Sequence, residues 1–249
     1  MRPHLRPLTL VTGGTRGIGR AVALRLAADG HDLVLGYHSD ADAATACADE
    51  VAALGATAVL VPGDLTDPDA VDTLFAAAAR PLAGVVNNAG ATLHLGPLAE
   101  TPVEVVRRTV DLNLTSALLV ARAAVRALGR SYGGAGGVLV NISSGAATLG
   151  SPGEYVQYAA AKAGVDALTL GLAQEVAADG VRVVGVAPGI VRTRIHEDAG
   201  EPGRLDRVGP LVPLGRAGEP EEVAAVVAFA LSDAASYVTG TTLRVAGGR

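Results

Sequence analysis

Short apolar runs rich in Val and Leu alternate along the chain with alanine-rich amphipathic segments. The apolar runs suit strands buried on both faces, and the amphipathic segments suit helices that cover a sheet. The pattern predicts seven strands, at Leu8 to Thr12, Asp32 to Gly36, Ala58 to Pro62, Gly84 to Val86, Gly137 to Asn141, Arg182 to Ala187 and Thr242 to Val245. It predicts helices over Ile18 to Ala28, Ala41 to Leu54, Pro68 to Ala78, Pro102 to Val106, Val110 to Leu128, Tyr155 to Ala178 and Pro220 to Leu231. This alternation is typical of an α/β, Rossmann-type fold, with a doubly wound parallel sheet and helices on both faces.

Residues 194–218 carry no such pattern and are interrupted by proline and glycine. A long connection without secondary structure is uncommon in a compact domain unless it covers a binding site. We therefore expect these residues to form a substrate lid. The length of the chain fits one domain over residues 1–249.

Charge and composition exclude several classes of partner. The chain has 20 basic and 25 acidic residues, and no basic block of the kind that follows a phosphate backbone. No apolar run reaches the roughly 18 residues of a membrane span. We expect a cytoplasmic protein with no nucleic-acid or membrane partner and no metal site. The lone Cys47 cannot form an internal disulfide and is assigned no role.

Lysine occurs only once among the 20 basic residues, at Lys162. A lysine supplies a compact ammonium whose pKa can move, which a guanidinium cannot. Tyr158 lies four residues earlier on a predicted helix, so both side chains project from one face. Because a neighbouring ammonium favours the phenolate, it lowers the pKa of a tyrosine. This pair is predicted to be the centre of proton transfer.

A glycine-rich turn from Thr12 to Gly19 follows the first predicted strand and opens a helix. Glycines let a pyrophosphate approach the helix N-terminus, where free N–H groups favour negative charge. Its spacing, T-G-x-x-x-G-x-G, resembles the short-chain dehydrogenase/reductase family. Further motifs of that family follow in order, namely Asp64 in Gly-Asp-Leu, Asn87-Asn88-Ala89-Gly90, Asn113, Ser143-Ser144, Tyr158-x-x-x-Lys162 and Pro188-Gly189. The resemblance covers nearly the whole chain and is best to 3-oxoacyl-acyl-carrier-protein-reductase-like and glucose-dehydrogenase-like members.

This resemblance implies a catalytic set of Asn113, Ser144, Tyr158 and Lys162. In reduction, Tyr158 protonates the carbonyl oxygen while a nicotinamide delivers hydride, and Ser144 hydrogen-bonds the same oxygen. Lys162 also binds the nicotinamide ribose. Asn113 bends its helix and holds a water of a proton relay.

Some alternatives remain at this stage. Ser144 lies one residue further from Tyr158 than is common in the family, so Ser143 stays possible, and Ser151 is a weaker candidate. Tyr155 has no lysine four residues on and is read as pocket wall. His94 and His196 could contact substrate or merely pack.

The resemblance also implies a cofactor site. Its residues are Gly13, Thr15, Arg16, Gly17, Ile18, Gly19, Tyr37, His38, Ser39, Asp64, Leu65, Asn87, Ala89, Gly90, Tyr158, Lys162, Pro188, Gly189, Ile190 and Thr193. An acid at the end of the second strand would bind the ribose 2′-hydroxyl and repel a 2′-phosphate. That place holds Tyr37, with no acid before Asp40, and Arg16 can face a phosphate. We expect NADP(H) to be preferred, with NAD(H) possible.

The leading hypothesis is an enzyme that reduces a 3-oxoacyl or polyketide-like ketone to a secondary alcohol with NADPH. The same fold could serve imine reduction, sugar or alcohol oxidation, or epimerase or dehydratase chemistry. A nucleotide-binding regulator without turnover is a remote alternative, against which the intact catalytic set argues. By resemblance we expect a homotetramer or dimer.

Overall fold

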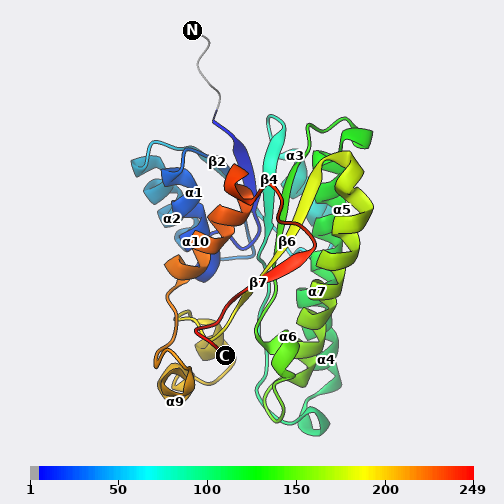
Figure 1. The fold of residues 1–249 in the computed structure, drawn as a ribbon. Coiled ribbons are helices and arrows are strands. Elements are labelled where there is room, and N and C mark those ends of the chain that lie inside the picture. The colour runs from blue at the N-terminus through cyan, green and yellow to red at the C-terminus, as the bar shows by residue number, and fades with distance from the viewer. Residues whose placement is uncertain (1–5) are drawn as a thin grey trace.

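The computed structural model describes residues 6–249, and its centre is one parallel sheet (Figure 1). The strands run in the order β3-β2-β1-β4-β5-β6-β7, and every neighbouring pair is parallel. Their bounds are β1 Leu8–Val11, β2 Asp32–Tyr37, β3 Ala58–Pro62, β4 Leu82–Asn87, β5 Gly137–Ile142, β6 Val181–Pro188 and β7 Thr241–Val245. All seven predicted strands are therefore confirmed, with ends shifted by a few residues.

Helices cover both faces of the sheet. They are α1 Gly17–Ala28, α2 Ala41–Ala53, α3 Pro68–Ala76, α4 Val103–Val110, α5 Ser116–Leu128, α6 Ala146–Leu149, α7 Val156–Val176, α8 Ile195–Asp198, α9 Arg204–Val208 and α10 Pro220–Leu231. One apolar core lies under α1, α2 and α10, and a second lies under α3, α5 and α7. Figure 1 shows these two helix groups on opposite sides of the sheet. A strand buried on both faces must be apolar throughout, which explains why the strands read as continuous Val and Leu runs.

The chain reverses its direction of winding between β1 and β4, which are neighbours in the sheet. From β1 the connections lead outward to β2 and β3, and from β4 they lead the other way to β5, β6 and β7. The loops after β1 and β4 consequently diverge above the carboxyl ends of the strands and leave a crevice there. This is where open α/β sheets bind ligands.

Two details differ from the sequence expectation. The predicted helices before and after position 110 are joined, because a π-helical turn over Asp111–Thr115 links α4 to α5 without a break. The segment 194–218 is not structureless, since it contains α8, α9 and a 3₁₀ turn over Gly209–Leu211. Between residues 6 and 249, no helix has both the length and the apolar character needed to cross a membrane.

Candidate active site

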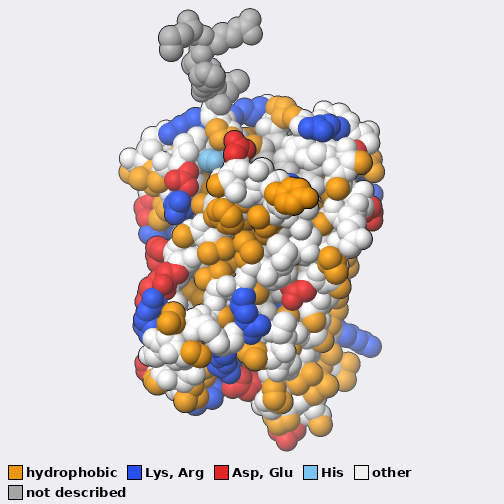
Figure 2. All heavy atoms as spheres, viewed as in Figure 1, with side chains coloured by type: hydrophobic (Ala, Val, Ile, Leu, Met, Phe, Trp, Pro, Cys, Tyr) orange, Lys and Arg blue, Asp and Glu red, His pale blue; other side chains and the backbone are white. Residues whose placement is uncertain are grey.

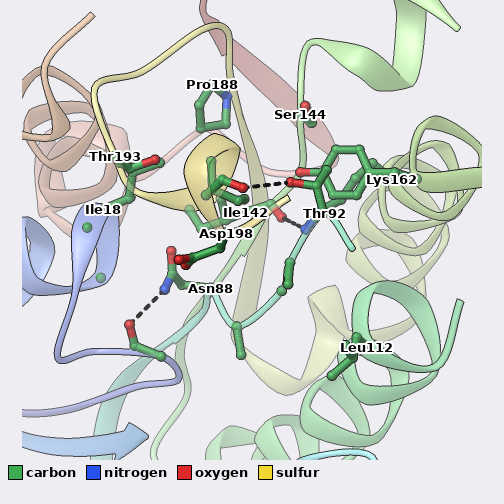
Figure 3. Close-up of a pocket in the computed structure, with 18 of the residues that line it drawn as sticks. Ile18, Asn88, Thr92, Leu112, Ile142, Ser144, Lys162, Pro188, Thr193 and Asp198 are labelled. Atoms are coloured by element: carbon green, nitrogen blue, oxygen red, sulfur yellow. Dashed lines mark hydrogen bonds between the residues drawn. The ribbon is translucent and has the colours of Figure 1, made fainter. Parts of the chain in front are cut away.

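A cavity of about 620 Å³ opens at the carboxyl ends of the strands. It runs from the glycine turn after β1, past the loops after β4 and β5, to the start of α7 and the segment after β6. Figure 3 shows Ile18, Asn88 and Thr193 on one side of it and Ser144 and Lys162 on the other. Residues far apart in the sequence are thus brought to one space.

In the glycine turn, the backbone at Gly19 packs directly against the backbone at Gly13. Gly13 has a φ of +59°, which L side chains rarely adopt. A Cβ at Gly19 would lie 1.9 Å from the carbonyl oxygen of Gly13, so only glycine fits there. In the part of the chain that the structure describes, no side chain caps the N-terminus of α1. Its free N–H groups face the cavity as an anion site, which fits the diphosphate of a dinucleotide.

The two asparagines of the Asn-Asn-Ala-Gly motif at the end of β4 make different contacts. The Asn88 side chain lines the cavity and donates to the backbone oxygens of Thr12 and Gly13, which locks the glycine turn to β4. Asn87, expected to line the cofactor site, lies instead inside the sheet, where its amide bridges Ala117 and Asn141. The reason is strand alternation: successive side chains point to opposite sides of the backbone. Ala89 and Gly90 line the cavity as expected.

Asp64 and Leu65 line the cavity, as expected of cofactor-site residues. One carboxylate oxygen accepts from the backbone N–H and hydroxyl of Thr66, and the other accepts from Arg108 at 2.7 Å. Burial alone would raise the pKa of Asp64, but Arg108 and Thr66 outweigh it and lower the pKa to about 2. The carboxylate is therefore ionised and fixed. Sequence reasoning missed Arg108 because the sheet order, not sequence distance, brings α4 beside the loop after β3.

The end of β2 forms the wall where an adenosine ribose would lie. Tyr37, His38 and Ser39 line the cavity there, as expected. Arg16 reaches across from the glycine turn to within 3.5 Å of Asp40, and its side chain is 52% exposed. Asp40 also caps α2 by accepting from the Ala43 N–H. An exposed pair of this kind is weak, so the guanidinium can exchange partners.

The remaining expected cofactor residues also line the cavity. They are Thr15, Gly17, Ile18, Pro188, Gly189, Ile190 and Thr193.

Tyr158 and Lys162 lie together at the cavity end of α7, and both side chains are buried. The Lys162 Nζ lies 5.8 Å from the centre of the Tyr158 ring and donates to the Ile142 carbonyl at 2.9 Å. Burial lowers the pKa of Lys162 to about 8. The ammonium expected from the sequence is therefore present at neutral pH but close to losing its proton.

The pKa of Tyr158 moves in the opposite direction to the expectation. Burial raises the pKa of the phenol well above its ordinary value, and the hydrogen bond with Ser144 opposes this rise only in part. Desolvation penalises the phenolate, and the neighbouring Tyr155 adds to the rise. The protein alone therefore keeps Tyr158 as a neutral phenol, which is the form that donates a proton.

The structure separates the candidate serines. The Ser143 hydroxyl is buried and donates to the backbone oxygen of Lys162 at 3.3 Å. The Ser144 hydroxyl instead lies close enough to Tyr158 to lower the pKa of its phenol. Ser144 also accepts from the Ala146 N–H at 3.1 Å, at the start of α6. Ser151 lines the cavity with a φ of +46°. The structure therefore brings Ser144, and not Ser143, to the Tyr158 phenol.

Asn113 lies on the π-helical turn between α4 and α5 and is buried. Its amide donates to the oxygens of Ala91 and Thr109, and its oxygen accepts from the Ala91 N–H. A Cβ built on Gly90 would meet both the Asn113 oxygen, at 2.7 Å, and the Lys162 Nζ, at 3.3 Å. Asn113 thus anchors the chain after β4 next to Lys162. It is not among the residues that line the cavity, although π-helical turns often mark functional sites.

The structure also places the second tyrosine, the two candidate histidines and the cysteine. Tyr155 lines the cavity and packs edge-to-face on Tyr158. His196 also lines it, and burial with nearby Arg204 lowers its pKa to about 4, so it is neutral at physiological pH. His94 packs near Gly96, outside the cavity wall. Cys47 is buried, which raises its thiol pKa to about 11 and makes it unreactive.

Arg204, on α9 within residues 194–218, also lines the cavity but was not identified from the sequence. It pairs with Glu154 and Glu201. Nothing in the sequence distinguishes it from the other arginines of residues 194–218, because its burial depends on how that segment folds back.

Comparison with known proteins identifies the family. A family model described as enoyl-(acyl carrier protein) reductase matches residues 13–249. This chain belongs to the short-chain dehydrogenase/reductase family. The Escherichia coli K12 uncharacterized oxidoreductase YgfF is 44% identical, covering 97% of this chain and 99% of its own. The 3-oxoacyl-[acyl-carrier-protein] reductase of Synechocystis is 38% identical, covering 97% and 96%.

The solved structures agree with this assignment. A short-chain dehydrogenase from Burkholderia cenocepacia, in complex with NADP, is 33% identical, has a TM-score of 0.88 and covers 97% of both chains. The protein described here is therefore an NAD(P)-dependent oxidoreductase of this family with a small-molecule substrate, and the Rossmann-type fold expected from the sequence is confirmed.

Proposed function

We propose that this enzyme reduces a 3-oxoacyl or polyketide-like ketone to a secondary alcohol, with NADPH as the preferred reductant. The observation that best supports this proposal is the burial of Tyr158. Its raised pKa keeps the phenol protonated beside Ser144, and the Lys162 Nζ lies over its ring. A protonated phenol is prepared to act as an acid, which is the role that reduction requires.

In this proposal, Ser144 and Tyr158 hold the carbonyl oxygen by two hydrogen bonds. These bonds strengthen as negative charge develops on that oxygen, and Tyr158 then transfers its proton to it. Lys162 stabilises the phenolate that remains, because its ammonium is still charged below a pH of about 8. Asn113 keeps Gly90 and Ala91 in place beside Lys162. A reduced nicotinamide, when bound, supplies the hydride.

The walls of the substrate end favour an apolar ketone. Leu93, Ala146, Leu149, Ile190 and Ile195 line this part of the cavity. The relative named as a 3-oxoacyl-[acyl-carrier-protein] reductase supports an acyl ketone. The proposal also treats residues 194–218 as the substrate lid, since Thr92 donates to the Ile195 carbonyl and joins this segment to the chain after β4. Figure 3 shows Thr92 at the edge of the cavity.

A substrate panel tests the reaction. NADPH absorbance is followed with acyl thioesters, diketones, sugars and cyclic imines in separate assays. We expect turnover with 3-oxoacyl thioesters or diketones, and none after Tyr158→Phe. Turnover restricted to sugars or imines would replace this proposal by one of the alternatives.

Two serine variants test the site. Ser144→Ala should lower kcat by about 100-fold, because it removes a hydrogen bond to the developing oxyanion. Ser143→Ala removes only a bond to the Lys162 backbone and should retain most activity. The reverse result would reassign the role to Ser143.

NADP(H) preference rests on Arg16 and on Tyr37 standing where an acid would exclude a 2′-phosphate. Thermal shift with NADPH and with NADH measures binding without turnover, and we expect the larger shift with NADPH. Tyr37→Asp should reverse the order. A larger shift with NADH in the native protein would contradict the preference.

A further inference from the structure

The lid carries a charged side chain that solvent does not reach. Arg204, at the start of α9, has a side chain that is 2% exposed. Arg207, one turn later on the same helix, is 52% exposed. Both arginines pair with Glu154, which precedes α7, and with Glu201 of the lid. Two arginines thus join the lid to the same carboxylate, and one of them is buried.

Contact with Tyr155 distinguishes Arg204 from Arg207. The Arg204 Nη2 donates to the Tyr155 hydroxyl at 2.9 Å, and its Cζ lies 4.9 Å from the centre of the ring. Among the interactions found between residues 6 and 249, Arg207 makes none with this ring. Arg204 therefore contacts Tyr155 in two ways, through a hydrogen bond to the tyrosine hydroxyl and through the face of the tyrosine ring.

Tyr155 in turn contacts the proton donor. Its ring packs edge-to-face on Tyr158, with centroids 5.4 Å apart and ring planes at 88°. The Tyr158 N–H also donates to the Tyr155 carbonyl at 3.0 Å, at the first turn of α7. Edge-to-face contact favours one relative orientation of two rings. A continuous set of contacts therefore leads from the lid, through Tyr155, to Tyr158.

The ion pairs that join the lid to Glu154 do not by themselves explain why Arg204 is buried. Removing a guanidinium from water is costly, and here the Nε has no hydrogen-bond partner in the described part of the chain. Arg207 already provides ion pairs to the same glutamates while remaining hydrated. The feature gained by burying Arg204 is its contact with Tyr155.

We propose that Arg204 is a positioning residue for Tyr158. By fixing Tyr155, it holds the Tyr158 ring in the orientation that aims the phenol at the substrate oxygen. When the lid docks, it encloses the substrate and also brings Arg204 against Tyr155, which packs on the proton donor Tyr158. This inference rests on the proposed role of Tyr158.

The two arginines offer a matched comparison. Arg204→Gln and Arg207→Gln each remove one partner of the same two glutamates, but only the first frees Tyr155. Kinetics are measured with NADPH and the ketone that the panel shows to be reduced. We expect Arg204→Gln to lower kcat by about 10-fold or more while KM changes by less than about 3-fold, since small misplacements of a reacting group are costly. Arg207→Gln should change both constants by less than about 3-fold.

Binding of NADPH, followed by fluorescence, and the melting temperature show whether each variant keeps its fold and cleft. Equal losses of kcat in the two variants, or a loss confined to KM, would overturn the positioning role.

Tyr155 variants test the same contact without disturbing the ion pairs. Tyr155→Phe keeps the ring and removes the hydroxyl, so the Arg204→Gln/Tyr155→Phe double variant should be no slower than Arg204→Gln alone. Effects that multiply would show two independent roles. Tyr155→Leu removes the ring and should lower kcat by about 10-fold with KM nearly unchanged. An unchanged kcat in Tyr155→Leu would also refute the proposal, even if Arg204→Gln does not fold.

Tyr158→Phe separates the two levels of inference. If that variant still reduces the ketone, the proposed role of Tyr158 as the proton donor fails, and the role of Arg204 that rests on it fails as well. If it is inactive while Arg204→Gln and Arg207→Gln behave alike, the proposed function stands and only the role of Arg204 is rejected.

Discussion

Burial sets the protonation states of Tyr158 and Lys162, and Lys162 shows this most directly. Its pKa is lowered to about 8, so the ammonium is fully present below that pH and is lost as pH rises through it. Tyr158 stays protonated throughout, because burial raises its pKa. We predict that kcat/KM for ketone reduction is constant at neutral pH and falls above about 8. A pH profile from 6 to about 9.5 checks this.

Lys162→Arg is the informative variant for that profile. The guanidinium keeps a positive charge at every accessible pH but must fit the space that Gly90 and Asn113 leave around the Nζ. We expect a loss of kcat of about 10-fold or more, and no fall of the residual rate near pH 8. Near-normal turnover would contradict the argument that this site requires a lysine.

The same burial predicts a gain in stability when the charge is removed. The folded protein penalises the Lys162 ammonium, a shift from 10.5 to about 8 that corresponds to about 3 kcal/mol. The lost hydrogen bond to Ile142 offsets about 1 kcal/mol of this. Lys162→Met should therefore unfold at higher urea concentration than the native protein at pH 7, although it is inactive.

The sign of the pH dependence tests this explanation. The penalty is complete below pH 8, shrinks as pH rises towards the unfolded value of 10.5, and vanishes above it. The difference in unfolding free energy between Lys162→Met and the native protein should therefore close as pH rises. A difference that widens with pH would exclude desolvation as its cause.

At the scale of the element, the π-helical turn is the feature that the sequence pattern did not predict. Asn113 satisfies three backbone groups from this turn, two of them on Ala91. We predict that Asn113→Ala lowers the free energy of unfolding by about 2 kcal/mol, because buried backbone groups lose their partners. It should also lower kcat, since Gly90, the neighbour of Ala91 in the chain, lies beside the Lys162 Nζ. Urea unfolding and steady-state kinetics measure the two effects.

Thr115 provides a control within the same turn. Among residues 6–249, its hydroxyl bonds only to the exposed Asp111. Thr115→Ala should leave both stability and kcat nearly unchanged. A similar effect of the two variants would mean that the turn as a whole, and not the Asn113 amide, is responsible.

At the scale of the whole molecule, apolar side chains remain exposed on two surfaces. Leu118 on α5 and Leu170 on α7 are 45% and 53% exposed, and Phe229 on α10 and the nearby Tyr237 are also exposed. Figure 2 shows hydrophobic side chains gathered over α10 and β7. Exposed apolar surface of this kind is typical of subunit interfaces.

We predict that the protein is a dimer or tetramer in solution. Light scattering with size exclusion measures the mass, and the Leu118→Glu/Leu170→Glu variant should give a smaller assembly, because charges are depleted from interface cores. Leu54→Glu, at an equally exposed leucine beside α2, is the matched control and should leave the mass unchanged. A native monomer would refute the prediction.

The sequence by itself determined the strands, the helices and most of the site. Period and composition mark buried parallel strands, and helical spacing puts Tyr158 and Lys162 on one face, because these are local properties of the backbone. The cofactor-site motifs lie at strand ends, which the parallel sheet gathers at one edge. All of the expected cofactor residues except Asn87 line the cavity, and apart from Tyr158 and Lys162 on α7 they reach it from or next to strand ends.

Only the tertiary structure decided what depends on burial and on distant neighbours. It raised the pKa of Tyr158 where the nearby lysine predicted a decrease, because desolvation depends on the surrounding protein. It paired the Asn87 side chain with Asn141 of the neighbouring strand, away from the cavity. It also placed Ser144, rather than Ser143, next to Tyr158. It also carried Arg204 from a segment without a pattern to Tyr155, a contact between residues 49 positions apart that no local rule foresees.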